Sequence, residues 1–144
     1  MNDEGKSLIQ NQGHLQLIQI TSAVGTGADM TIEAKPDSGE DWSIVWMIGR
    51  HDDSGGARDC YWQWFDSGQT PNVTITLPTQ AAMTTAQRLM AWALEPASAR
   101  ERSPVGNNLS CTHKCYPKLT VKALAATGKA YIEALVYRRQ GVSG

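Results

Sequence analysis

The sequence predicts an all-β fold, an antiparallel β-sandwich or jelly roll of about eight short strands. Apolar and polar residues alternate with a period of two through most of the chain, the pattern of strands with one dry and one wet face. Turns rich in glycine, proline and aspartate separate these segments. No convincing long helix interrupts the series, and short strands at this spacing are typical of sandwiches and jelly rolls.

The expected strands share the two-residue alternation. In the first, HLQLIQI, the alternation changes phase between Leu17 and Ile18, so we expect a β-bulge there. In the third, WSIVWMI, the pattern puts Trp42 and Trp46 on the same face. The eight segments are 14–20, 30–35, 42–48, 60–65, 72–77, 88–95, 118–125 and 130–138.

The segment 79–95, TQAAMTTAQRLMAWALE, is open to two interpretations. It is compatible with a short helix and with a loop followed by a strand. Pro78 before it, Pro96 after it and Trp92 within it leave both open. We favour the loop followed by a strand.

Two turns organise the predicted strand order. DSGG at 53–56 is expected to be a solvated turn between adjacent strands at 42–48 and 60–65. ATG at 126–128 is expected to join the last two strands as a hairpin.

The chain of 144 residues fits one domain. Residues 1–14 form a polar arm, and we expect residues 15–144 to form a single β-sandwich domain. Within it, residues 96–117, PASARERSPVGNNLSCTHKCYP, form a long irregular loop. Compact domains seldom keep such a loop without a use for it.

Charge and hydropathy exclude several classes of protein. The net charge is −1 and no Lys/Arg face stands out, so we expect no nucleic-acid partner. No apolar run approaches the roughly 20 residues of a spanning helix, so we expect no membrane contact. The first residues lack the apolar core of a signal peptide, so we expect production in a cytoplasm.

The stretch HDDSGGARDCYWQWF, residues 51–65, is the main candidate for chemistry. Asp52, Asp53 and Asp59 are candidates for calcium ligands or for a hydrolytic carboxylate pair. Their spacing matches no loop of the EF-hand type. The interpretation we favour is that these residues form only the solvated turn between two strands.

Trp62 and Trp64 share one face of the strand at 60–65. If they point inward with Trp42 and Trp46, the four rings form an aromatic core, which we favour. If they point outward, the indoles form a platform that stacks on sugar rings, with the acidic loop bonding the hydroxyls. That second arrangement predicts a carbohydrate-binding module or lectin.

The three cysteines are an odd number, which argues against a secreted disulfide framework. Cys111, His113 and Cys115 lie in CTHKC and could bind zinc together with Cys60, but this spacing is not that of the usual zinc knuckle. A bridge between Cys60 and a loop cysteine is the other alternative. We favour free thiols, with no metal and no cofactor.

The sequence gives little support for catalysis. His14, His51 and His113 lie in the arm and in two loops, no serine lies in a Gly-x-Ser-x-Gly elbow, and no glycine-rich loop precedes a helix. We therefore expect a protein that is not an enzyme.

Two stretches carry a resemblance to a known class. AKPDSGEDWSIVWMI contains a P-x-G-x-x-W turn that begins a strand, and ATGKAYIEALVYRRQGV is a final strand that ends in basic residues and Gly-Val. Together they resemble the small β-sandwich decoration or cement proteins of tailed-bacteriophage capsids, over about a third of the chain. The resemblance implies a protein that clamps capsid subunits on the outside of a shell, often as a symmetric oligomer.

We therefore expect a virion structural protein, assembled in the host cytoplasm onto the virion surface. Its partners would be capsid subunits and other copies of itself. Segments that order on binding can wrap a partner, which suits an arm and a long loop. The residues expected to bind partners are Leu8 and Ile9 in the arm, and Arg100, Arg102 and Leu109 in the loop.

Overall fold

The computed structural model describes residues 14–93 and 110–140, and its regular structure is entirely β-strand. The strands form two antiparallel five-stranded sheets, so the predicted all-β sandwich is confirmed. Within these residues no helix is long and apolar enough to cross a membrane. The strands are β1 (His14–Thr21), β2 (Met30–Glu33), β3 (Glu40–His51), β4 (Arg58–Asp66), β5 (Val73–Thr76), β6 (Gln80–Met83), β7 (Leu89–Ala93), β8 (Ser110–Thr112), β9 (Cys115–Val121) and β10 (Ala130–Gln140).

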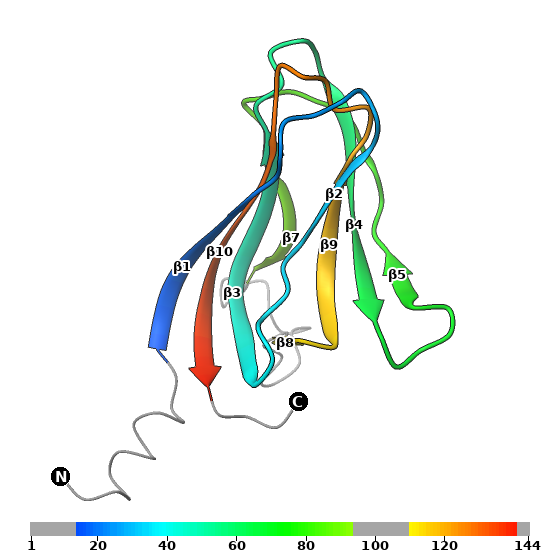
Figure 1. The fold of residues 1–144 in the computed structure, drawn as a ribbon. Helices are drawn as coiled ribbons and strands as arrows, with labels where there is room; N and C mark the ends of the chain where they lie inside the picture. Colours follow the sequence, from blue (N-terminus) through cyan, green and yellow to red (C-terminus); the bar gives the residue numbers. More distant parts are fainter. Residues whose placement is uncertain (1–13, 94–109, 141–144) are drawn as a thin grey trace, which may run out of the picture.

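The two sheets form the two layers of the sandwich (Figure 1). Sheet A has the order β1-β10-β3-β7, and β8 also pairs with β3. Sheet B has the order β2-β9-β4-β5, and β6 also pairs with β4.

At one edge of each sheet, two short strands together occupy the place of a single strand. β5 and β6 pair with successive parts of β4, and β7 and β8 pair with successive parts of β3. The described residues therefore fill four positions in each sheet, in agreement with the expected eight strands. The described part of the segment 79–95 contains no helix, and β7 lies where the strand was predicted. The part predicted to be a loop was only partly right, because it contains β6.

Three predicted connections were wrong. β3 and β4 lie in different sheets, and so do β9 and β10, so neither pair is adjacent or forms a hairpin. Alternation marks a strand without saying which sheet it joins, and the connections 52–57 and 122–129 cross the roughly 10 Å between packed sheets. The predicted loop at 96–117 is also too long, because β8 and the start of β9 lie inside it.

The bulge lies in β3 rather than in β1. The register of β1 against β10 is continuous from His14 to Thr21, whereas β3 shifts its register at Val45. This extra residue rotates the rest of the strand, so Trp42 and Met47 are buried while Trp46 is only half-buried. The prediction that Trp42 and Trp46 share a face was therefore wrong.

The core lies between the sheets and is built mainly from alternate residues of the long central strands. Trp62 is 1% exposed, and its indole nitrogen donates a hydrogen bond of 3.0 Å to the Leu89 carbonyl. Trp64 is half-buried and packs against the same cluster. The largest fully buried apolar side chains besides Trp62 are Ile44, Met47, Met83, Leu119, Leu124, Ile132, Val121 and Val136.

Candidate functional site

The outer face of sheet A, which points away from the core, carries a continuous set of apolar side chains. Leu17 on β1 lies opposite Leu135 on β10, and Leu135 lies opposite Trp46 on β3. The neighbouring rows contain Leu15 opposite Tyr137, and Ile48 opposite Met90. We call this set the apolar face; its residues are Leu15, Leu17, Trp46, Ile48, Met90, Leu135 and Tyr137.

Several members of the apolar face are strongly exposed. Leu17 is 69% exposed, Leu15 51% and Tyr137 47%. Adjacent exposed apolar side chains on one sheet differ from scattered single ones, because a contiguous patch of this kind usually marks an interaction site. The apolar face is therefore the strongest candidate for a binding surface in the described residues.

The far end of the same sheet face is polar. Arg50 bonds the Glu133 carboxylate at 3.0 Å, and its guanidinium lies over the Tyr131 ring at 4.0 Å. These groups satisfy one another across β3 and β10. The apolar face is thus bounded by a polar rim on the side of the 52–57 connection.

The outer face of sheet B has a different character. Thr31 and Thr120 share a hydrogen bond of 2.8 Å between their hydroxyls, and Lys118 forms an ion pair of 3.5 Å with Glu33. Gln63 donates to the Thr76 hydroxyl. Such cross-strand polar pairs are typical of a sheet face that water covers. The same face also holds the adjacent rings of Phe65 and Tyr116, but Lys118 and Lys35 lie over them. The two outer faces therefore differ in that large apolar side chains are strongly exposed on sheet A, whereas those on sheet B are covered by paired polar groups.

The carboxylate of Asp53 is a structural anchor. The residue is 1% exposed, and Oδ2 accepts hydrogen bonds from Arg58 Nε at 2.8 Å and the Ala125 amide at 2.9 Å. Oδ1 accepts from the Gly55 amide at 2.8 Å and from the Thr127 hydroxyl. The Thr127 hydroxyl first, and the Ala125 amide next, hold the pKa of Asp53 below its ordinary value of 3.8. Each oxygen of this carboxylate therefore accepts two hydrogen bonds, which leaves no lone pair for a metal or a substrate.

Asp52 in the same connection and Asp59 in β4 also accept hydrogen bonds from the backbone. Asp52 accepts from the Lys129 amide at 2.7 Å and from the Tyr131 hydroxyl at 2.7 Å, and Asp59 accepts from the Ala82 amide at 2.9 Å. The connection at 52–57 is thus a turn, as we favoured, but Asp53 within it is buried rather than solvated.

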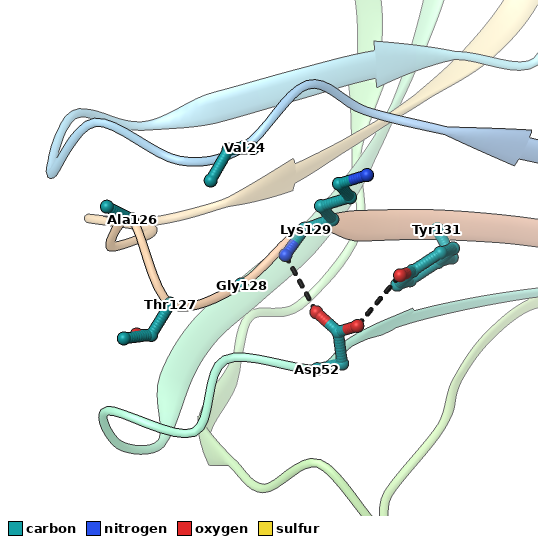
Figure 2. Close-up of a pocket in the computed structure, with 7 residues that line it drawn as sticks. All are labelled: Val24, Asp52, Ala126, Thr127, Gly128, Lys129 and Tyr131. Atoms are coloured by element: carbon teal, nitrogen blue, oxygen red, sulfur yellow. Dashed lines mark hydrogen bonds between the residues drawn. The ribbon is translucent and has the colours of Figure 1, made fainter.

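A shallow pocket of about 370 Å³ opens beside Asp52. Its walls come from the connections after β1, β3 and β9 and from the start of β10 (Figure 2). Both carboxylate oxygens of Asp52 already accept hydrogen bonds, one from the backbone amide of Lys129 and one from the Tyr131 hydroxyl. The side-chain amine of Lys129 points away from Asp52 (Figure 2). The pocket therefore offers a ligand little free polar chemistry.

The hypothesis of an exposed tryptophan platform for sugar rings is not supported at Trp62. Trp62 is buried and uses its indole nitrogen inside the core, so its ring cannot stack on a ligand. Trp64 packs against the same core. The aromatic-core interpretation is right for Trp42, Trp62 and Trp64 and wrong for Trp46, which lies on the apolar face.

The cysteines are separate and free. Cys60 and Cys111 are fully buried and Cys115 is half-buried. Burial raises the pKa of the Cys60 thiol to about 12 and also raises that of Cys115, so neither favours the thiolate that a metal or a nucleophile needs. Across residues 14–93 and 110–140, no three His, Cys, Asp or Glu side chains gather closely enough to hold a metal ion.

The residues expected to bind partners, Leu8, Ile9, Arg100, Arg102 and Leu109, lie outside the described residues. The structure does describe the strand residues to which the segments 1–13 and 94–109 are attached. Residues 1–13 precede His14 at the start of β1, and residues 94–109 connect Ala93 at the end of β7 to Ser110 at the start of β8; both strands pair with β3. Both segments therefore join sheet A, which carries the apolar face.

The apolar face was not predicted from the sequence, although the segment HLQLIQI contains a signal for it. HLQLIQI has apolar residues on both strand faces, Leu15 and Leu17 on one and Ile18 and Ile20 on the other. We interpreted this as a bulge, whereas it reflects a strand that is apolar on both sides.

Comparisons of the chain with protein-family models, with curated proteins and with solved structures found no match. The class that the fold defines is therefore an antiparallel β-sandwich with one apolar outer face.

Proposed function

We propose that this protein is a non-enzymatic virion structural protein that decorates and cements a capsid shell. The observation that carries the proposal is the contrast between the exposed apolar side chains on the outer face of sheet A and the outer face of sheet B, where cross-strand polar pairs and lysine side chains cover the apolar groups. A protein that lies on a shell needs one face for the shell and the other for water.

Contact energy at this face comes from side chains that are now in water. Covering an exposed leucine or tyrosine contributes on the order of 1–2 kcal/mol. Leu15, Leu17 and Tyr137 form a compact group on two paired strands, so one flat partner surface could cover all three. Flat apolar patches with a polar rim are typical of protein interfaces and not of small-molecule pockets.

The strand order supports the class of fold in the proposal. With β5 and β6 counted as one strand and β7 and β8 as another, the sheets are ordered 1-8-3-6 and 2-7-4-5. We infer from this order that the sandwich is a jelly roll, an architecture common in viral capsid proteins and also found in lectins. The apolar face favours the capsid role over the lectin role, because the lectin platform residue Trp62 is buried.

The segments beside sheet A would add to the contact. In this proposal Leu8 and Ile9 insert into apolar sites on neighbouring subunits, and Leu109 does the same from the loop. Arg100 and Arg102 pair with carboxylates of a neighbour. The virion surface is the location, and capsid subunits and other copies of this chain are the partners.

The proposal is tested on virions made by the genome that encodes the chain. We expect mass spectrometry of purified particles to find the chain at a fixed ratio to the capsid subunit. We also expect immunogold labelling to decorate the shell. Particles that are free of the chain would overturn the proposal.

Tyr137→Lys is expected to weaken binding of the chain to shells that lack it by at least about tenfold. The change puts a charge beside Leu15 on the apolar face and leaves the stability of the chain nearly unchanged, because Tyr137 is 47% exposed. Thr31→Lys is the matched control, since it adds the same charge to the exposed outer face of sheet B. Co-sedimentation with shells measures both. Equal binding by the two variants would show that sheet A is not the contact.

A further inference from the structure

Among residues 14–93 and 110–140, β1 forms one edge of sheet A and pairs only with β10, so its outward backbone groups can be identified. The Ser22 amide donates to the Ala130 carbonyl at 2.9 Å, and the register of β1 against β10 is continuous. In an antiparallel pair only alternate residues bond the neighbour. The even-numbered residues of β1 therefore bond β10, and the odd-numbered ones point their N–H and C=O groups away from it; these are Leu15, Leu17, Gln19 and Thr21.

The other sheet edges in the described residues are protected. β2 has four residues and ends at Glu33. The β5–β6 edge is broken at Pro78, and Ala82 has a positive φ of 49°. The β7–β8 edge is interrupted between Ala93 and Ser110. Short strands, breaks, prolines and charges are the usual means of preventing edge pairing.

β1 has none of these protections. Its eight residues, HLQLIQIT, contain no proline, no glycine and no Asp, Glu, Lys or Arg, and its pairing with β10 is unbroken. A long, regular and uncharged edge is a template for another strand.

We propose that β1 pairs antiparallel with β1 of a second copy of this chain, about a two-fold axis perpendicular to sheet A. An uncharged edge meets itself without like-charge repulsion, and a two-fold axis makes one surface serve both partners. In the proposed register Leu17 lies opposite Gln19 of the second copy, and Leu15 lies opposite Thr21 of the second copy. Each of the four outward-pointing residues of one copy then has a partner in β1 of the other. Four such pairs with two bonds each give eight hydrogen bonds.

The pairing also joins the apolar faces. The axis keeps both on the same side of one continuous sheet, and Leu17 of each copy comes within diagonal contact of the other. The inference names the surface for the contact between copies in the proposed function. It does not depend on the capsid role, because it rests on the edge alone.

The test uses the full chain without any capsid. At tens of micromolar we expect light scattering to give about twice the 15.7 kDa of one chain. Gln19→Pro should weaken this association by at least about tenfold, because it removes an edge N–H and places a ring in the pairing plane. The fold should survive, since the Gln19 N–H makes no bond to β10. Gln19→Thr keeps the N–H and should remain dimeric.

Three results would overturn the inference. A monomeric wild-type chain would exclude the pairing, and a dimer that Gln19→Pro leaves intact would place the contact on another surface. A chain that dimerises only after residues 1–12 are deleted would show that its own N-terminal segment covers the edge. If Gln19→Pro does not fold, hydrogen exchange of the wild type decides: the Leu17 and Gln19 amides must lose protection on dilution. Failure here leaves the capsid-binding test unaffected, because that test changes Tyr137.

Discussion

Replacing Asp53 with alanine is expected to lower the free energy of unfolding by about 3–5 kcal/mol, the range for removing one member of a buried, hydrogen-bonded ion pair; here the removed carboxylate is the buried member. The buried carboxylate bonds Arg58, the Gly55 and Ala125 amides, and the Thr127 hydroxyl. Alanine leaves all four donors without an acceptor, and it removes the bonds of Ala125 and Thr127 that tie the 122–129 connection to the 52–57 connection, leaving those between Asp52 and Lys129. Urea unfolding at pH 7 measures the change.

Asparagine provides a sharper comparison. Each oxygen of Asp53 accepts two hydrogen bonds, so either orientation of an amide in Asp53→Asn sets its NH₂ group against at least one N–H group. At Oδ2 the NH₂ group meets Arg58 and the Ala125 amide; at Oδ1 it meets the Gly55 amide, and only the Thr127 hydroxyl can turn to accept. We expect a loss similar to that of alanine. Asp52→Asn is the matched control, since its amide can accept from the Lys129 amide and donate to the Tyr131 hydroxyl, and it should cost less than about 1 kcal/mol. Equal losses for both asparagine variants would contradict the anchor role.

The same carboxylate predicts acid sensitivity. Its pKa is lower in the folded chain than the ordinary 3.8, so the charged form stabilises the fold. This contribution is complete above the unfolded pKa and is lost as pH falls below it, through the folded value. We expect the urea midpoint of the wild type to fall between pH 5 and pH 2, and to fall less in Asp53→Ala. Parallel pH profiles would mean that other carboxylates cause the acid sensitivity.

Replacing Trp62 with alanine is expected to cost about 3–5 kcal/mol, the range for a large aromatic side chain in a core. The ring is 1% exposed, and its removal leaves a large cavity and an unpaired Leu89 carbonyl. Trp62→Phe keeps most of the volume but loses the hydrogen bond, so we expect a smaller loss of about 1–3 kcal/mol. Urea unfolding followed by circular dichroism measures both. A loss below 1 kcal/mol for alanine would place the ring outside the core and restore the sugar-platform hypothesis.

The sequence was sufficient to predict the strands because alternation is a local property. It could not assign strands to sheets, since β3–β4 and β9–β10 look like hairpins when only turn residues and alternation are considered. The pairing partner is set by packing between distant segments. The interrupted positions β5–β6 and β7–β8 depend on the same long-range register.

The apolar face could not be predicted from the sequence because it depends on a register shift of one residue in β3. The bulge at Val45 moves Trp46 from the core side to the outer face, and no motif in WSIVWMI marks that position. The roles of neighbouring acids were likewise hidden. Asp52 and Asp53 are adjacent in sequence, yet one is exposed and the other buried, because Thr127 and Ala125 arrive from a connection more than seventy residues later.

The polar outer face of sheet B has a practical consequence for labelling. Dyes, affinity tags or displayed peptides attached at an exposed position such as Thr31 would project from the side opposite to Leu17 and Tyr137. If the chain coats a capsid as proposed, such conjugates would present their cargo to the medium in a single orientation. The chain thus has a built-in polarity that a carrier for surface display requires.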